Sequence, residues 1–314
     1  MNRPLLLRLF LVAGVAALCA FPALAGKFYL QLFAKIMLMA VFAMSLDLLV
    51  GYGGLVSLGH TAFFGVGAYA LLILSPQAQA ASLWLTLPVA IAAAALAALV
   101  IGLLVLRSSG VYFIMVTLAF TQMFYYLAIG TKSVGGSDGA YIYVKPAATI
   151  FGWTLFDLER PIQFYYVALG LMVATYFLLR VVLNSLFGHV FCGIKSNEQR
   201  LRALGFATFR YKLAGFVLAG ALAGLAGYFD AVQFGFVNPD LFGWRLAGEV
   251  LMMVILGGMG TLYGPVLGAF ALVLMENALT GTTRHWLLPM GLFIILAVLA
   301  LPKGFGGLIE RKRA

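Results

Sequence analysis

The feature that most constrains the fold is a series of long apolar runs, most of them long enough to cross a lipid bilayer. A helix rises about 1.5 Å per residue, so about 20 apolar residues span the hydrocarbon core. Hydrophobic residues form 64% of the 314-residue chain, and the mean hydropathy of +1.06 excludes a soluble domain. We therefore expect an all-α, polytopic membrane helix bundle. The runs are residues 5–25, 28–50, 83–106, 111–129, 162–183, 213–236, 244–278 and 286–301.

The number of crossings depends on two glycine-rich stretches. Residues 51–69 carry six glycines and follow directly on the second run, so we expect an interrupted helix there. Residues 244–278 are too long for one span, and the glycines of 257–264 divide them into two short halves. Each half either crosses the membrane or enters and leaves it on the same side. With both counted, the sequence predicts about ten transmembrane helices and cytoplasmic N and C termini.

The basic residues agree with this topology. Cytoplasmic loops of membrane proteins carry an excess of Lys and Arg. Those that the topology places inside are Arg3, Arg8, Arg107, Arg180, Lys195, Arg200, Arg202, Arg210, Lys212, Lys303, Arg311, Lys312 and Arg313. Fewer fall outside, namely Lys27, Lys132, Lys145, Arg160, Arg245 and Arg284. The net charge of +10 thus reflects orientation in the membrane and not a nucleic-acid-binding face.

The first 26 residues allow two interpretations. Arg3 and Arg8, followed by an apolar run and then Ala23-Leu24-Ala25, fit both a cleaved signal peptide and a retained first span. We favour the retained span because residues 5–25 are long enough to cross.

The most polar segment is residues 187–211, between two apolar runs. Residues 199–204 are predicted to be helical, and Gly205 ends the helix as a C-cap would. Glu198 and Arg202 are four residues apart and share a face. One interpretation is an ordinary basic cytoplasmic loop that sets orientation. The other is an amphipathic segment that docks on a partner at the membrane surface.

The two glycine-rich stretches are candidates for the translocation path. Glycine in a helix interior is about 1 kcal/mol less favourable than alanine, so its retention indicates close helix packing or a break that lines a cavity. We expect backbone irregularity over residues 60–69 and 257–264, with Gly65, Gly67, Gly257 and Gly258 near the path. Ser57 and His60 belong to the first stretch. His60 is either a packed, hydrogen-bonded residue near a helix start or a substrate ligand.

Other polar residues in the runs also have two interpretations each. Thr117, Thr121 and Gln122 form a stripe that either bonds a neighbouring helix or lines the path. Asp47, Glu249 and Glu276 are carboxylates in apolar runs, and such charges are functional candidates that equally serve structural pairing. Residues 130–161, rich in glycine and aromatic residues, are predicted to lie at the outer interface.

The glycine motifs and the polar segment together resemble one family of permeases. Residues 57–69 read SLGHTAFFGVGAY, residues 257–265 read GGMGTLYGP, and residues 194–198 with Ala203-Leu204-Gly205 match a coupling loop. The chain resembles the branched-chain amino acid permeases of ABC importers, and among them the M-type subunit. The likeness extends over about residues 35–305.

The resemblance implies a function and a set of partners. The chain would be one permease domain over 1–314, with residues 187–211 as the cytoplasmic coupling loop. Its partners would be an H-type second permease, two ATP-binding subunits and an extracytoplasmic solute-binding protein, in a bacterial inner membrane. ATP and Mg would be used by the partner subunits, because the chain carries no ATPase motif and no catalytic or metal-binding spacing.

From these features we predict which residues serve the two tasks. Coupling to the ATPase would involve Lys195, Glu198, Arg202 and Gly205. The translocation path would involve Ser57, His60, Gly65, Gly67, Thr121, Gly257 and Gly258. The expected substrate is leucine, isoleucine or valine. The alternatives are urea, amides or aromatic acids within the same family, or an ion-coupled secondary transporter using the carboxylates at 47, 249 and 276.

Overall fold

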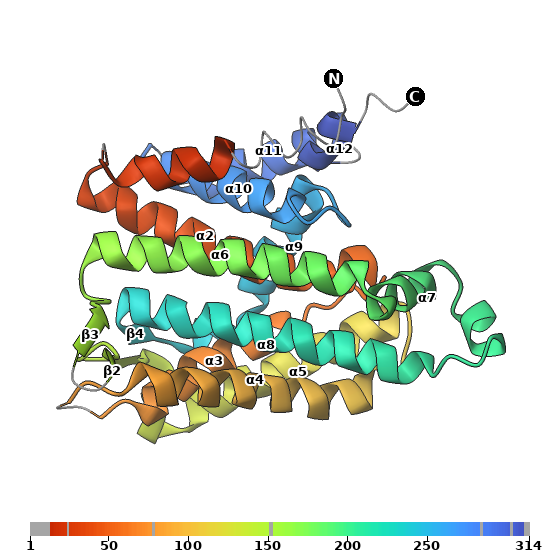
Figure 1. Cartoon of the computed structure of the whole chain (residues 1–314), viewed down its shortest axis with the longest axis horizontal. Helices are drawn as coiled ribbons and strands as arrows, with labels where there is room; N and C mark the ends of the chain where they lie inside the picture. The colour runs from red at the N-terminus through yellow and green to blue at the C-terminus, as the bar shows by residue number, and fades with distance from the viewer. Residues whose placement is uncertain are drawn as a thin grey trace.

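The computed structural model describes residues 13–23, 25–76, 79–150, 153–282, 285–301 and 304–310. Its helices lie side by side along one common direction and form a bundle (Figure 1). The predicted all-α architecture is confirmed. Residues 13–20 are helical. The helices that follow are α2 (Lys27–Asp47), α3 (His60–Leu74), α4 (Leu83–Val105), α5 (Val111–Gly130), α6 (Pro161–Asn184), α7 (Leu186–Ala203), α8 (Thr208–Phe234), α9 (Trp244–Gly257), α10 (Gly264–Thr280), α11 (Leu287–Ala300) and α12 (Gly304–Glu310).

The short elements lie mainly at one end of the bundle. Strand β1 (Ala140–Tyr141) pairs antiparallel with β4 (Phe236–Val237), and β2 (Ala148–Ile150) pairs antiparallel with β3 (Trp153–Phe156). The single turns are η1 (Phe21–Ala23), η2 (Leu48–Tyr52, a π-helical turn), η3 (Lys132–Val134), η4 (Gly136–Asp138) and η5 (Pro239–Phe242). The sheets lie at the end opposite to α7 (Figure 1). The two polar stretches of the sequence, 130–161 and 187–211, therefore lie at opposite ends of the bundle.

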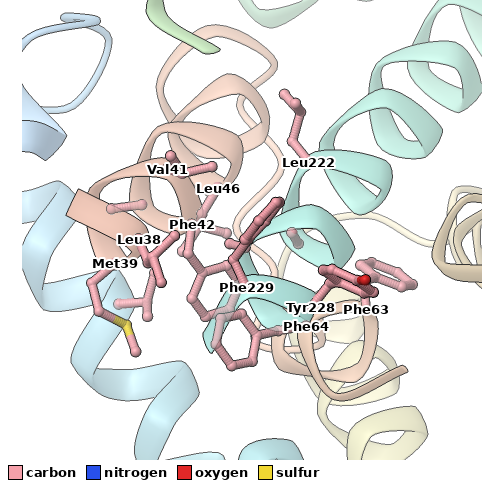
Figure 2. Packing of buried hydrophobic residues seen from close by; sticks show 14 of the residues in the cluster. Leu38, Met39, Val41, Phe42, Leu46, Phe63, Phe64, Leu222, Tyr228 and Phe229 are labelled. Carbon is pink, nitrogen blue, oxygen red and sulfur yellow. The ribbon is translucent and has the colours of Figure 1, made fainter. Parts of the chain in front are cut away.

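The core is centred on α2 and α8. The apolar window of α2 with η2 is 89% buried and that of α8 is 78% buried, whereas only 22% of the α5 window is buried. Phe42 of α2, Phe64 of α3 and Phe229 of α8 come together in the cluster shown in Figure 2. The rings of Phe42 and Phe64 are 4.5 Å apart between centroids. Aromatic pairs at this distance add to the stabilisation by burial.

Small residues allow the central helices to approach closely. A Cβ at Gly67 of α3 would overlap the backbone of Gly224 in α8, and one at Gly227 would overlap the carbonyl of Phe64. Gly220, four residues before Gly224, faces α4 through Ala98. Such small-residue contacts are typical of membrane helix packing. The small residues of α8 thus form a packing face for α3 and α4.

Within the part of the chain that the structure describes, six helical stretches are long and apolar enough to cross a membrane. They are residues 27–52, 83–105, 111–130, 161–184, 208–234 and 287–307. The stretches 13–23, 60–74 and 264–280 are apolar but shorter. Ten crossings would require these shorter helices, with α9, to cross as well. The predicted first span falls partly on residues 1–12, which lie outside the described residues, as do the basic residues at 3, 8, 284, 303 and 311–313.

One expectation about the backbone is wrong. Residues 60–69 are a regular part of helix α3 and not an irregular segment. The break lies just before them, where the π-helical turn Leu48–Tyr52 passes into the non-helical residues 53–59. The second expectation is confirmed, because α9 ends at Gly257 and α10 begins at Gly264 with no helix between them.

The outer helices expose much apolar surface. Leu104 of α4, Leu127 of α5, Val181 of α6 and Leu299 of α11 are among many large hydrophobic residues that are more than half exposed. A monomeric soluble protein does not carry apolar surface on this scale. These faces are suited to lipid or to another membrane subunit.

Candidate functional site

The polar segment forms a bent pair of helices at one end of the bundle. Helix α7 contains one non-helical residue, Asn197, whose φ of −161° and ψ of 96° divide it into two parts. The Asn197 side chain accepts a hydrogen bond from the backbone N–H of Arg200 at 2.9 Å, as an N-cap does for a new helix. The second part ends before Gly205, which adopts a φ of +87°. The predicted helix and its glycine stop are confirmed.

Glu198 holds this second helix against the start of α8. Its Oε1 accepts hydrogen bonds from Arg202 Nη2 at 2.6 Å and from Thr208 Oγ1 at 3.0 Å. Its Oε2 accepts from Lys212 Nζ. The prediction that Glu198 and Arg202 share a face is confirmed, and the pair is engaged within the chain itself. Glu198 thus braces the loop.

The electrostatics of Glu198 agree with that bracing role. Partial burial by itself would raise the pKa of the Glu198 carboxyl, but the hydrogen bonds from Lys212, Arg202 and Thr208 and the charge of Lys212 outweigh it. The pKa therefore lies below its ordinary value of 4.5, and the carboxylate is held ionised.

The tip of the segment projects from the bundle (Figure 1). Residues 202–207 are exposed, and among them Leu204 is 68% and Phe206 38% exposed. Two exposed apolar side chains on either side of Gly205, flanked by Arg202 and Arg210, form a small apolar patch with a basic rim. A helical end of this kind fits a hydrophobic groove on a partner.

Lys195, in the first part of α7, points back into the bundle. Its Nζ donates a hydrogen bond to the backbone carbonyl of Gly51 at 2.5 Å. Gly51 lies in the π-helical turn that ends the central helix α2. A Cβ at Gly54 would fall 2.9 Å from Lys195 Cγ, so the lysine stem also packs on the non-helical segment. Lys195 therefore links the polar segment to the break after α2.

The same break contacts the second glycine-rich segment. Asp47, the last residue of α2, is 1% exposed, and its Oδ1 accepts a hydrogen bond from the backbone N–H of Gly260 at 2.9 Å. Gly260 has a φ of +78°. A Cβ at Gly51 would overlap both Asp47 Oδ1 and the Gly260 nitrogen. The two glycine-rich stretches, over 200 residues apart in the chain, thus meet at one point, which we call the break junction: Asp47, Gly51, Lys195 and Gly260.

Helix α5 fastens the non-helical residues 53–59. Thr117 Oγ1 accepts a hydrogen bond from the backbone N–H of Leu58 at 3.3 Å, and Thr121 Oγ1 donates to the Leu58 carbonyl at 3.4 Å. Ser57 is 1% exposed and accepts from the backbone N–H of Gly59. Thr117 and Thr121 therefore form hydrogen bonds to a neighbouring segment, as the first of the two interpretations of the polar stripe expects. Backbone groups without a helix need such partners inside a membrane.

His60 is packed in the core. It is 1% exposed, its Nε2 lies 2.9 Å from Ser45 Oγ, and its ring stacks on Phe42 with a centroid distance of 5.6 Å. This is the geometry of a packed, hydrogen-bonded histidine at a helix start. A role for His60 on the path stays a prediction.

The predicted path glycines fall into two groups. Gly65 and Gly67 lie inside regular helix, where a Cβ would overlap the ring of Phe242 or the backbone of Gly224. Gly257 and Gly258 lie at the C-terminal end of α9, where the segment that contains Gly260 begins. A Cβ at Gly257 would overlap the Gly264 carbonyl, and Gly258 has a φ of +111°. Lys195 is linked to the 257–264 segment through Gly51, whose turn packs on Gly260.

The chain matches the family model described as branched-chain amino acid transport system / permease component over residues 28–301. That match covers most of the chain. The chain belongs to this family. It is 30% identical over 318 residues to the high-affinity branched-chain amino acid transport system permease protein LivM of Escherichia coli strain K12, covering 95% of this chain and 74% of the relative.

Other relatives match a shorter part of the chain and are named for the import of autoinducer 2. The autoinducer 2 import system permease protein LsrC of Yersinia pseudotuberculosis serotype O:1b is 32% identical over 131 residues, which cover 39% of this chain and 37% of the relative. No solved structure matches the chain significantly. The chain is thus a multi-pass membrane permease component related to branched-chain amino acid permeases.

Sequence reasoning overlooked the junction itself. The sequence indicates that Asp47 serves function or structural pairing but not which group it meets, and it shows Gly260 only as part of the 257–264 stretch. One feature of the sequence could have indicated the junction. Asp47 lies at the end of an apolar run, just before a glycine-rich stretch, and a carboxylate inside a membrane requires a partner.

Proposed function

We propose that this chain is the M-type permease subunit of an ATP-driven importer of branched-chain amino acids. The chain would form one permease domain over 1–314 with about ten crossings and both termini in the cytoplasm. It would act in a bacterial inner membrane beside an H-type permease, two ATP-binding subunits and an extracytoplasmic solute-binding protein. ATP and Mg would be bound by the ATP-binding subunits and not by this chain.

The observation that carries the proposal is the projecting tip of residues 202–207 joined to the core by Lys195. An ATP-driven permease without its own ATPase needs a surface on which the ATPase docks and a connection from that surface to the membrane helices. Leu204 and Phe206 supply apolar contact area at the tip. Glu198 holds the tip on α8 through its bonds to Arg202, Thr208 and Lys212. When the ATPase displaces the tip, the start of α8 would therefore move with it.

Lys195 carries the displacement further. Its bond to the Gly51 carbonyl ties α7 to the break after α2, and Asp47 ties that break to Gly260 between α9 and α10. Helix ends and breaks absorb backbone rotation with little change elsewhere, as hinges do. Closure of the ATPase would therefore reach two interrupted helices at one point. This is a positioning role for Lys195, since it acts through the Gly51 backbone.

Photo-crosslinking tests the docking surface. Benzoylphenylalanine placed at Leu204 in the assembled complex is expected to crosslink to an ATP-binding subunit. The matched control is the same residue at Leu299 on α11, another leucine with high exposure (75%). Crosslinks from position 204 to lipid or to the solute-binding protein, and not to an ATP-binding subunit, would contradict the proposed docking.

The ligand that the solute-binding protein retains identifies the substrate. The binding protein encoded with this permease is purified and its retained amino acid is identified by mass spectrometry. Leucine, isoleucine or valine supports the proposal. Urea, an amide or an aromatic acid would move the chain to another substrate within the same family.

A further inference from the structure

A second site lies at the end of the bundle that carries the β1–β4 pair. A pocket of about 490 Å³ opens between α2, α8 and α9 under the β1–β4 pair. Its size falls within the range of about 300–1,000 Å³ that small-molecule sites occupy. Lys35 of α2 and Asp230 of α8 are its charged lining residues, and Met39, Phe234 and Leu246 are among its apolar ones.

The carboxylate of Asp230 is buried and incompletely bonded. Asp230 is 5% exposed, and its Oδ1 makes no hydrogen bond within the described part of the chain. A buried acceptor left without a donor destabilises a fold by about 1–3 kcal/mol, more for a charged group. Such groups are retained in membrane proteins where they meet a substrate or ion.

The ammonium of Lys35 faces the same pocket and is not paired with Asp230. The two attract each other electrostatically, but no ion pair within 4.0 Å joins them among the described residues. The neighbouring carboxylate, Glu249, is bonded to Arg245 at 3.0 Å. The pocket therefore presents one positive and one negative group, held apart, with apolar walls around them.

We infer that this pocket binds a free α-amino acid as its zwitterion, with the ammonium on Asp230 and the carboxylate on Lys35. A ligand whose ammonium and carboxylate are attached to the same carbon satisfies both side chains at once, and Met39, Phe234 and Leu246 accept an apolar side chain. A simple amine would leave the half-buried Lys35 without a partner, and a simple acid would leave the buried Asp230 without one, which is the basis of discrimination against both. The choice of a branched-chain amino acid as ligand rests on the proposed function. The inference adds that the permease itself binds the amino acid before it crosses the membrane.

The position of the pocket fits a receiving site. Tyr141 of β1 and Asn238, which follows β4, line it, and the β1–β4 pair lies at the end opposite to α7 (Figure 1). In the predicted topology that end faces outward, where a solute-binding protein delivers its ligand. Lys35 lies eight residues inside α2, which is about 12 Å along the helix axis. An amino acid held there has already left the outer surface.

A protection assay tests the site directly. In the assembled complex, with Cys19 and Cys192 replaced by serine, Leu246→Cys places a thiol on the pocket wall. Millimolar leucine is expected to slow its alkylation several-fold. Neither 3-methylbutylamine, which lacks the carboxylate, nor 4-methylpentanoate, which lacks the ammonium, should do so.

Variants then identify the charged partners. Asp230→Asn and, separately, Lys35→Met are expected to abolish protection by leucine, whereas Asp230→Glu retains it in part. Asp157→Asn, on the exposed loop at the same end, is the matched control and should leave protection unchanged. Assembly of each variant is checked by the yield of the intact complex. If an Asp230→Asn complex assembles and is still protected by leucine, the inference is wrong.

The outcome is separable from that of the proposed function. If the complex imports leucine but the thiol is not protected, the importer stands and this pocket is not its site. If the complex imports no branched-chain amino acid, protection is measured with the other natural amino acids. Protection by one of them, lost in Asp230→Asn, supports the zwitterion site, and no protection by any overturns it.

Discussion

Asp47 and Gly260 are joined by a hydrogen bond of 2.9 Å between a buried carboxylate and a backbone N–H. They are separated by 213 residues in the chain. The bond connects the end of the most buried helix to the break between α9 and α10. Lys195 of α7 donates a hydrogen bond to the Gly51 carbonyl in the π-helical turn that follows Asp47. Three segments that the sequence presents separately therefore share one junction.

The first prediction concerns this bond. Asp47→Ala removes the acceptor and leaves the Gly260 N–H without a partner, so we expect uptake to fall about tenfold or more, the effect of losing a hydrogen bond to a charged group. Asp47→Asn retains an acceptor oxygen and is the matched control, with most activity preserved. Uptake is measured in cells at equal amounts of assembled complex. Equal uptake in Asp47→Ala and the native protein would exclude a role for the bond.

The second prediction concerns the brace at residue 198. Glu198→Ala together with Arg202→Ala leaves Lys212, whose side chain is 14% exposed, without its carboxylate, and should destabilise the tip by about 1–3 kcal/mol. We expect lower ATP-driven uptake with normal membrane insertion. Normal uptake together with normal co-purification of the ATP-binding subunit would contradict the role of the brace.

The third prediction concerns the pH dependence of the same brace. Because the pKa of Glu198 is lowered on folding, its ionised form contributes stability that is fully present above the unfolded value of 4.5 and is lost as the pH falls through the folded pKa. Hydrogen exchange of residues 198–212, corrected for intrinsic rates, should be constant from pH 8 to 5 and accelerate below 4.5. Glu198→Gln should show faster exchange throughout and no such step. A step of the same size in that variant would assign it to another group.

The fourth prediction concerns the topology. A cysteine at Ser137, an exposed residue in the outer loop, should react with an impermeant thiol reagent added outside the cell. A cysteine at Ala203, in the exposed tip, should react only after the membrane is permeabilised. Both variants lack Cys19 and Cys192. The reverse pattern would invert the orientation.

The fifth prediction separates packing glycines from tolerated ones. Gly67→Leu would place a side chain on the backbone of Gly224 where α3 crosses α8, so the complex should fail to assemble. Gly170→Leu, in α6, meets nothing within 4 Å and is the control. Assembly is measured by the yield of intact complex in mild detergent. Normal assembly of the Gly67 variant would show that the helices can separate there.

Periodicity and run length predicted the helices, because a bilayer imposes a minimum length and an apolar surface on each span. The stop at Gly205 and the shared face of Glu198 and Arg202 followed from local rules of helix geometry. The break before α3 was misplaced. Residues 60–69 carry glycines for close packing on α8, and composition does not distinguish such glycines from those of a break.

The junction was not predictable from local rules. Which carboxylate meets which backbone N–H depends on how α2, α7 and the α9–α10 connection are arranged in space, and one sequence carries no record of such long-range pairs. The pocket between Lys35 and Asp230 depends on the same arrangement.

The most direct measurement compares transport with ATP hydrolysis in proteoliposomes that contain the whole complex. Lys195→Met keeps the length of the side chain but removes its hydrogen bond to the Gly51 carbonyl, and Lys195→Arg keeps a donor as the control. We predict that the Lys195→Met complex assembles and hydrolyses ATP near the native rate, while leucine transported per ATP falls about tenfold or more. A native ratio of transport to hydrolysis in the assembled Lys195→Met complex would contradict coupling through the break junction.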